Sequence, residues 1–245
     1  MKSGQRRILI VEDEEAIATG LRFNLQAEGY DAFVLPDGPS TLSYLDEHPG
    51  SLDLVLLDLM LPGMSGYEIC RSIRETEDIL PIMVLSARTL TEDKAHAFDC
   101  GADQYMTKPF AIPELMSRVR NLLARNERLI RIGESKARNQ AKENYLFGNV
   151  EVDFRQFQVI RDGETHPLTT LEMQLLSYFI DHANDVLSRS RILKDVWDTS
   201  VEVSTRTIDN FVMRLRKYIE ADPANPQHLI SVRGTGYRFV PDLDG

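Results

Sequence analysis

Short apolar runs recur along the first half of the chain, and stretches with apolar residues at helical spacing separate them. An unbroken run of four or five apolar residues is typical of a strand buried on both faces of a parallel sheet. The pattern predicts strands over residues 7–11, 31–35, 54–58, 81–86 and 103–107, with helices near 14–28, 37–48, 67–75, 91–100 and 111–125. This alternation indicates an α/β fold, a doubly wound five-stranded parallel sheet with right-handed crossovers.

Polar side chains stand at the carboxyl ends of four of these strands: Glu12 with Asp13, then Asp58, Ser86 and Lys108. Parallel strands point the same way, so these residues gather at one edge of the sheet, where open α/β sheets bind their ligands. Carboxylates are ligands that suit Mg²⁺, and a lysine suits a phosphate as a point charge. The four strand ends together therefore predict a phosphoryl site.

The acidic positions also have ordinary structural explanations. Asp58 comes shortly before Pro62 and Gly63, and an Asp beside a turn often satisfies local backbone groups. Residues 12–15 are four consecutive acids, which are favoured in the first turn of a helix. The agreement of four strand ends that lie far apart in the sequence favours the phosphoryl site.

The second half has shorter elements. Alternating apolar and polar residues predict strands over residues 145–153 and 157–161, with Asp162-Gly163 as a hairpin turn. Thr169-Thr-Leu-Glu172 is a capping box that begins a helix reaching about His182. Further helices are expected over 190–197 and 204–220, and a hairpin over 229–240. These elements predict a smaller α+β domain.

The helix expected over 204–220 has two faces. Its core face carries Ile208, Val212, Leu215 and Ile219, and its other face carries Arg206, Asp209, Asn210, Met213, Arg214 and Lys217. Such a polar face can enter a DNA major groove, where Arg reads guanine and Asn reads adenine. A solvated surface is the commoner meaning of such charges. The hairpin that follows presents Arg233 at its tip, and a helix followed by such a wing is winged helix-turn-helix geometry.

Length and charge refine this interpretation. The 245 residues suit two domains, and 42% hydrophobic residues are enough for two cores. The net charge of −10 argues against nucleic acid when the chain is read whole. Residues 1–125 carry 12 Lys/Arg and 20 Asp/Glu, whereas residues 126–245 carry 16 and 18. The second half is therefore nearly balanced, and a local patch matters more than the total.

The chain is expected to work in the cytoplasm. Cys70 and Cys100 form neither a metal-ligand spacing nor a disulfide framework, which fits a reducing compartment. No apolar core of a signal peptide follows Met1, and no apolar run is long enough to span a bilayer. We expect a first domain over residues 1–125, a linker over 126–144 and a second domain over 145–245.

The first half resembles the receiver domain of two-component response regulators, with a flavodoxin-like fold, across residues 7–125. The matching motifs are Glu12-Asp13, Asp58 within Asp-Leu-Met-Leu-Pro-Gly, Ser86-Ala87, Tyr105 and Lys108-Pro109. The resemblance implies that Asp58 accepts a phosphoryl group from a histidine of a sensor kinase and forms an aspartyl phosphate. A metal and a cation would neutralise the charge that spreads over the phosphoryl oxygens.

The resemblance also assigns supporting roles. Asp13, Asp58 and the Met60 carbonyl would ligate Mg²⁺, and Glu12 would act mainly through water. Lys108 would pair with phosphoryl oxygens, and a cis bond would precede the proline after it.

Ser86 and Tyr105 would form a switch, in which the hydroxyl moves to the phosphoryl group and the ring fills the vacated space. Without the resemblance, Tyr105 is interpreted as ordinary half-buried packing.

The second half resembles the OmpR/PhoB-type output domain across residues 145–240. The motifs are Arg206-Thr-Ile-Asp209, Arg214-Leu-Arg216-Lys217 and Val232-Arg-Gly-Thr-Gly-Tyr-Arg-Phe239. The resemblance implies phosphate contacts from Trp197, Arg206 and Thr207, base contacts from Asp209, Asn210 and Arg214, and a minor-groove contact from Arg233. Residues 198–204 would face RNA polymerase.

Three residues depart from the pattern of this output domain. Met213 stands where a phosphate-binding Arg is frequent, which would weaken general affinity. Asn210 replaces an apolar contact, which would alter base preference. Asp198 replaces a common Gly after the tryptophan, which leaves the turn of that loop open.

The resemblance further implies a two-fold dimer of phosphorylated receivers. Matching positions place Lys94 opposite Glu114, Asp103 opposite Arg125, and Gln104 opposite Arg118, in largely exposed pairs. Gln104 is a departure, because an acid is usual at this position.

The sequence is interpreted as a phosphorylation-controlled, sequence-specific DNA-binding transcriptional regulator of a two-component system. Mg²⁺ is the expected cofactor, and a sensor histidine kinase, promoter DNA, RNA polymerase and a second copy of the chain are the expected partners. Enzymatic chemistry is expected only at the receiver itself, because the second half offers no convergent acid, base and nucleophile. The alternative is a phosphorelay or protein-interaction module that never binds DNA.

Overall fold

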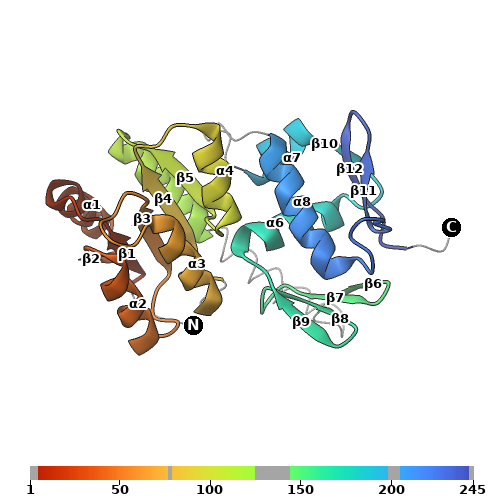
Figure 1. Ribbon diagram of the computed structural model, residues 1–245, viewed down its shortest axis with the longest axis horizontal. Helices are drawn as coiled ribbons and strands as arrows, with labels where there is room; N and C mark the ends of the chain where they lie inside the picture. The colour runs from red at the N-terminus through yellow and green to blue at the C-terminus, as the bar shows by residue number, and fades with distance from the viewer. Residues whose placement is uncertain (1–4, 77–78, 125–143, 198–204, 243–245) are drawn as a thin grey trace. The chain divides into compact units, whose positions relative to one another are not determined.

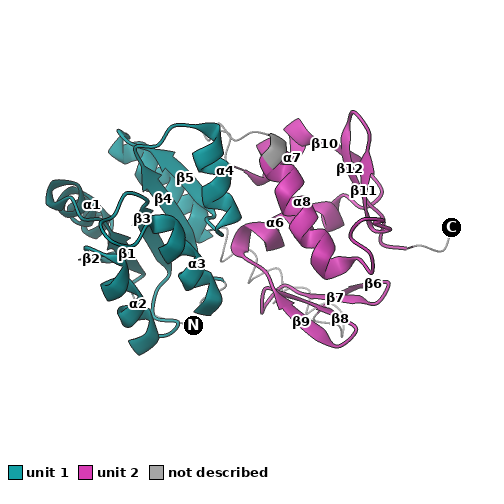
Figure 2. Ribbon diagram, in the orientation of Figure 1, with its two compact units in different colours: residues 1–126 teal, residues 127–245 magenta. Residues whose placement is uncertain are grey.

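The chain folds into two compact units, residues 1–126 and residues 127–245 (Figure 2). The computed structural model describes residues 5–76, 79–124, 144–197 and 205–242. Within these residues, no helix is both long enough and apolar enough to cross a membrane.

Unit 1 contains a five-stranded sheet in the order β2-β1-β3-β4-β5, and all neighbouring strands are parallel (Figure 1). Its strands are β1 (Arg7–Val11), β2 (Asp31–Leu35), β3 (Leu54–Asp58), β4 (Ile82–Ser86) and β5 (Gln104–Thr107). The predicted doubly wound parallel sheet is confirmed. Every residue of β3 and β4 is buried, as expected for strands covered by helices on both faces.

The helices of unit 1 are α1 (Glu15–Ala27), α2 (Gly38–Glu47), α3 (Gly66–Thr76), α4 (Thr91–Asp99) and a last helix over residues 112–124. Side chains of α1 and of the last helix pack with alternate residues of the strands in one apolar core, which includes Leu21, Leu25, Leu56 and Leu115. Helices α2, α3 and α4 lie on the other side of the sheet (Figure 1). Helices therefore cover both faces of the sheet, and a site can form only at the carboxyl edge.

Strand β1 lies between β2 and β3, so the chain reverses its direction of winding beside β1. The connections after β1 and β3 then leave in opposite directions and open a crevice at the carboxyl ends of these strands. Register places Asp58 beside Leu85 and Ser86 beside Thr107. The predicted site residues therefore end adjacent strands.

Unit 2 is an α+β domain. Its strands form a four-stranded antiparallel sheet, β6 (Tyr145–Phe147), β7 (Val150–Asp153), β8 (Gln158–Arg161) and β9 (Glu164–Pro167), and a three-stranded sheet in the order β10-β12-β11. The members of the second sheet are β10 (Val186–Ser188), β11 (Leu229–Val232) and β12 (Gly236–Phe239). Between the sheets in sequence lie α6 (Thr170–Asp181), α7 (Arg189–Val196) and α8 (Thr205–Ile219).

One prediction for unit 2 needed correction, and two strands were not predicted. Residues 145–153, expected as one strand, form the hairpin β6–β7, because Gly148 adopts a φ of 51° and turns the chain. The predicted hairpin turn at Asp162-Gly163 is confirmed, but no range was predicted for β9 after it, since the side chains of β9 are mostly exposed and show no apolar alternation. Strand β10 was not predicted either, because its three residues are held by pairing with β12, which is distant in sequence.

Two further local predictions for unit 2 are confirmed. Thr169 and Glu172 form both hydrogen bonds of the capping box at the start of α6. The hairpin β11–β12 has the predicted position, and Arg233 is exposed in its turn.

Candidate functional site

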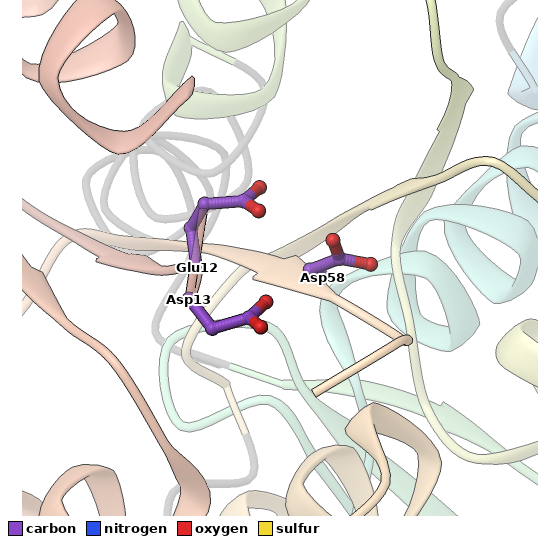
Figure 3. Close-up of side chains that lie close together, drawn as sticks. All are labelled: Glu12, Asp13 and Asp58. Atoms are coloured by element: carbon purple, nitrogen blue, oxygen red, sulfur yellow. The ribbon is translucent and has the colours of Figure 1, made fainter. Parts of the chain in front are cut away.

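Three carboxylates meet at the carboxyl edge of the unit 1 sheet. Glu12 and Asp13 follow β1, and Asp58 ends β3 (Figure 3). Each residue offers an oxygen that lies within 4.8 Å of the others. Glu12 and Asp58 are buried, whereas Asp13 is exposed. The site is therefore a negative crevice that opens to solvent on one side.

Lys108, which follows β5, supplies the balancing charge. Its Nζ donates to Glu12 Oε2 at 2.7 Å and to Asp58 Oδ2 at 2.5 Å. The other carboxylate oxygen of Asp58, Oδ1, accepts a hydrogen bond from the backbone N–H of Met60 at 2.9 Å. Asp58 is thus held by one charged and one neutral donor, and its carboxylate has a fixed orientation.

Burial and charge act in opposite directions on these groups. Burial raises the pKa of Glu12, and the Lys108 ammonium only partly offsets this effect. Burial alone would lower the pKa of Lys108, but its hydrogen bonds and charge interactions with Asp58 and Glu12 raise it above its ordinary value. Lys108 is therefore charged across the physiological range, and it keeps two buried acids in place.

Two backbone features complete the crevice. The bond between Lys108 and Pro109 is cis, as the sequence resemblance implied. Gly66, at the start of α3, allows close packing: an added Cβ would lie 2.2 Å from the carbonyl oxygen of Asp58. A side chain at position 66 would therefore displace the strand end that carries Asp58.

The predicted switch residues lie beside this crevice. Ser86 ends β4, and its Oγ accepts a hydrogen bond from the backbone N–H of Arg88 at 3.2 Å. The Tyr105 hydroxyl donates to the carbonyl oxygen of Arg88 at 2.8 Å. Both switch side chains thus contact the backbone of one residue, Arg88, in the loop after β4. Sequence reasoning missed Arg88, because its backbone rather than its side chain makes these contacts.

The donor set fits a hard divalent cation. The crevice presents carboxylate oxygens from three residues, one of which is open to solvent, and Mg²⁺ prefers a few carboxylates together with water. Met60, the fourth predicted ligand, follows directly in the loop after β3, and its side chain is 56% exposed. Its outward side chain leaves the crevice free for backbone and solvent ligands.

Lys108→Ala is expected to destabilise the metal-free protein by roughly 1–3 kcal/mol at pH 8, because two buried carboxylates lose their charged donor. The raised pKa of Glu12 means that its ionisation costs folded stability as pH rises through that value. Without Lys108 this cost is no longer opposed, so the loss should be smaller at pH 5 than at pH 8.

Urea unfolding with a chelator at both pH values measures this difference. Lys108→Arg, which keeps the charge, serves as the control. Equal stabilities of wild type and Lys108→Ala at pH 8 would show that the ammonium does not hold these acids together.

The exposure expected for the predicted dimer residues needs correction, first at Asp103. It was expected in an exposed pair, but its side chain is 1% exposed. Its Oδ2 accepts hydrogen bonds from Arg74 Nη2 at 2.7 Å and from the backbone N–H of Ile82 at 2.9 Å. Asp103 therefore joins α3 to β4 within unit 1. Its predicted partner, Arg125, lies outside the described residues.

The other predicted dimer residues occupy α4, β5 and the last helix. Lys94 lies on α4, and Gln104 begins β5. Both are buried in the folded chain, as is Arg118, whereas largely exposed pairs were expected. Arg118 pairs with Glu114 one turn earlier in the same helix, at 2.7 Å, and also donates to the Tyr105 carbonyl oxygen at 3.4 Å. A pairing of Arg118 across a dimer would therefore compete with a partner that it already has.

In unit 2, α8 carries the residues predicted to contact DNA. Ile208, Val212, Leu215 and Ile219 are buried, as expected for the core face. Arg206 and Thr207 lie in the first turn, and the side chain of Arg206 lies outside the described part of the chain. Asn210 lies further along and is half-buried, and Met213 is 53% exposed.

Asp209, predicted to contact a base, has partners within unit 2. Its Oδ1 accepts hydrogen bonds from Arg189 Nε at 2.8 Å and from the Tyr237 hydroxyl at 2.6 Å. Arg189 begins α7, and Tyr237 lies on β12, so the carboxylate joins three elements. Burial and the Asp209 carboxylate raise the pKa of Tyr237 to about 12, which keeps its hydroxyl protonated as a donor. Asp209 thus fixes α8 against the wing.

Arg214 has partners within unit 2 as well. Its Nε lies 3.1 Å from Oε1 of Glu172, and its guanidinium carbon lies 4.1 Å from the centre of the Phe211 ring. The side chain is 20% exposed. The predicted base contact of Arg214 stays a prediction, and it would be made by a side chain that already has partners within unit 2. Glu172 and Phe211 therefore restrict the guanidinium before any DNA is bound.

The remaining predicted DNA contacts have these positions. The ring of Trp197, after α7, packs edge-on against Phe211 at 5.2 Å, and its N–H has no hydrogen-bond partner among the described residues. This N–H is itself buried, so the phosphate contact of Trp197 stays a prediction. Arg233 is exposed in the wing turn. The loop 198–204, predicted to face RNA polymerase, lies outside the described residues.

Both halves of the chain match known protein families. Residues 8–120 match the family described as "Response regulator receiver domain", and residues 163–239 match "Transcriptional regulatory protein, C terminal". A solved structure of a RitR mutant shares the fold, with a TM-score of 0.75 at 24% identity over 96% of this chain and 98% of that chain.

Curated relatives match along nearly the whole chain. Sensory transduction protein RegX3 of Mycobacterium tuberculosis is 40% identical over 232 residues, covering 95% of this chain and 98% of the relative. DNA-binding response regulator MtrA of Mycolicibacterium smegmatis is 39% identical over 242 residues, covering 98% and 100%. The acidic crevice lies within the residues that match the receiver family, and α8 and the wing lie within those that match the C-terminal family. The chain therefore belongs to the OmpR/PhoB-type response regulators, the DNA-binding transcriptional regulators of two-component systems.

Proposed function

We propose that Asp58 is the phosphoryl acceptor of this regulator and that Mg²⁺ binds between Asp58 and Asp13. The observation that carries this proposal is the position of the Asp58 carboxylate, which contacts the Lys108 ammonium and lies beside two further acids. A carboxylate at a strand end, with a cation on one side and oxygen ligands on the other, is suited to attack a phosphorus atom. Glu12 also contacts Lys108, but Asp58 ends the central strand β3, and the N–H of Met60 orients its carboxylate as well.

In the transfer, an Asp58 oxygen forms a bond to phosphorus while the bond between phosphorus and the kinase histidine nitrogen breaks, and that nitrogen keeps the electron pair. The charge on the phosphoryl oxygens is then compensated by Lys108, which leaves the Asp58 oxygen for a phosphoryl oxygen. Bound Mg²⁺ would supply further charge compensation. Lys108 and the fixed Asp58 carboxylate orient the group.

The switch follows from the contacts of Arg88. Ser86 accepts a hydrogen bond from the Arg88 N–H, and its own hydroxyl proton can be donated to a phosphoryl oxygen. Movement of Ser86 shifts the loop that also holds the Tyr105 hydroxyl. Phosphorylation at Asp58 thereby changes the surface formed by α4, β5 and the last helix of unit 1.

The output is DNA binding by α8 and the wing. Arg214 reads a base, and Arg206, Thr207 and Trp197 hold phosphates. Arg233 enters the minor groove. The protein works in the cytoplasm, beside the chromosome, and contacts RNA polymerase while bound to a promoter. Its chemistry is limited to phosphorylation and dephosphorylation of its own aspartate.

Phosphate-dependent footprinting tests this function. Genomic fragments are digested with a nuclease in the presence of the protein, before and after the protein is treated with acetyl phosphate and Mg²⁺. Protection of defined sites that strengthens after treatment is the expected result. If no fragment is protected under either condition, the result would favour a phosphorelay module, because such a module does not bind DNA.

We also propose that phosphorylated receivers form a two-fold dimer through α4, β5 and the last helix of unit 1. Gln104→Asp should tighten this dimer, because an acid opposite Arg118 adds a charged pair twice in a symmetric interface. At about 0.2–1 kcal/mol for each pair at a protein surface, the gain is roughly 0.4–2 kcal/mol, about two- to thirtyfold in dissociation constant. Competition from Glu114 and the burial of Gln104, which makes a carboxylate there costly, place the result in the lower half of this range.

Sedimentation equilibrium of wild type and Gln104→Asp, both carrying a phosphoryl mimic at Asp58, measures this change. The gain should shrink with added salt, since salt screens charges near the surface. Coincident dissociation constants at low salt would show that Gln104 does not face Arg118 across a dimer.

A further inference from the structure

Glu172 has a different partner for each of its carboxylate oxygens. Oε2 accepts a hydrogen bond from the backbone N–H of Thr169 at 2.9 Å, which completes the capping box of α6. Oε1 lies 3.1 Å from Nε of Arg214 on α8. The carboxylate is 4% exposed, so it is a buried charge whose position is fixed by the first turn of α6. One side chain thus joins the start of α6 to α8.

The guanidinium of Arg214 is supported on a second side. It lies over the Phe211 ring, one turn earlier on α8, and the ring of Trp197 meets Phe211 edge-on. Arginine stacks well on aromatic faces because its guanidinium is planar and weakly hydrated. A carboxylate on one side and an aromatic face on the other restrict the guanidinium to a narrow range of orientations.

We propose that Glu172 is a positioning residue for sequence reading: it holds Arg214 on Phe211 in the orientation in which the guanidinium meets a base. This inference rests on the proposed base contact of Arg214. A side chain that is already ordered loses less conformational entropy on binding, so affinity for the cognate site rises. The carboxylate also offsets the charge of Arg214, which weakens its attraction to phosphates at every sequence. Both effects raise the ratio of specific to nonspecific affinity.

A capping role for Glu172 alone leads to a different expectation. A capping box accepts Gln as well as Glu at this position, since only one acceptor oxygen is needed by the backbone N–H of Thr169. An amide has a single oxygen, so Gln at position 172 that caps α6 turns its NH₂ group toward Arg214. Glu172→Gln therefore keeps the cap and removes the hold on the guanidinium. Thr169→Ala does the reverse.

The experiment compares binding of the full-length chain to two DNA duplexes. One is selected from a randomised library by the wild-type protein, and the other is its scrambled sequence. We divide the dissociation constant for the scrambled duplex by that for the selected duplex and call this the affinity ratio. For Glu172→Gln the affinity ratio should fall about two- to twelvefold, the range expected when one side chain is no longer held in place. The loss should map to one base pair of the selected site. Affinity for the scrambled duplex should stay the same or increase.

Thr169→Ala is the matched control, because it weakens the cap and leaves the pair of Glu172 and Arg214 in place. Its melting temperature should fall while the affinity ratio stays at the wild-type value. Glu172→Gln introduced into an Arg214→Lys background should change the ratio no further, because the guanidinium that it positions is absent.

Four outcomes would overturn the inference. Equal losses on both duplexes for Glu172→Gln would show a purely structural role. Tighter binding to the selected site would show that Glu172 holds Arg214 away from DNA. If Arg214→Ala lowers the affinity ratio and Glu172→Gln does not, Arg214 contacts a base but Glu172 does not position it. An unchanged ratio for Arg214→Ala would instead remove the base contact itself.

Discussion

Asp58→Asn is expected to abolish phosphoryl transfer and to leave the fold of unit 1 intact. The amide of Asn is too weak a nucleophile to attack phosphorus. Glu12 also contacts Lys108, but only Asp58 ends the central strand β3 with its carboxylate oriented by the N–H of Met60. The amide oxygen can still accept a hydrogen bond from Lys108, and the substitution removes one charge from a crowded acidic crevice. The expected result is therefore a folded protein that gains no phosphoryl mass.

Incubation with acetyl phosphate and Mg²⁺, followed by intact-mass measurement, tests this expectation. Asp46→Asn, at an exposed acid on α2, should gain one phosphoryl mass like the wild type and serves as the control. The strengthening of DNA binding by acetyl phosphate should be lost in Asp58→Asn and kept in Asp46→Asn. One added phosphoryl group on Asp58→Asn would assign the acceptor role to another residue.

Arg214→Ala is expected to relax sequence preference by roughly 1–3 kcal/mol at one base pair. A bidentate contact between arginine and guanine is lost, and the other base pairs of the site keep their contacts. Arg206→Ala should behave differently, because a phosphate contact is the same at every sequence. It should weaken all sequences alike and lower the dependence of log K on log salt by about one.

Binding titrations at several salt concentrations, on selected and scrambled duplexes, separate the two effects. Arg214→Ala leaves the buried Glu172 carboxylate without its charged partner, so folding must be checked by circular dichroism. Arg214→Lys keeps a charge opposite Glu172 and lacks the planar fork, so it should also lose selectivity while remaining folded. Equal losses on both duplexes for both variants would contradict the base contact.

Sequence periodicity determined the architecture of unit 1, since apolar runs of strand length alternate with helical patterns. Parallel strands share a direction, so Glu12, Asp58 and Lys108 could be placed together before any distance was known. The capping box at Thr169 could be predicted for a similar reason, because its partners lie within one helical turn. These features depend on local or topological rules, which a sequence carries directly.

Only the tertiary structure decided which partner each polar side chain has. Helical spacing placed Asp209 and Arg214 correctly on the polar face of α8, but it could not show that Arg189, Tyr237 and Glu172 hold them. The position of a residue on a face depends on local periodicity.

The identity of the partner of a polar side chain depends on how distant elements pack. Asp103 was assigned to a dimer contact by the family resemblance, which could not show that Arg74 and the N–H of Ile82 bind it within unit 1. A buried carboxylate needs donors, and donors brought from another helix or strand are visible only when the chain is folded.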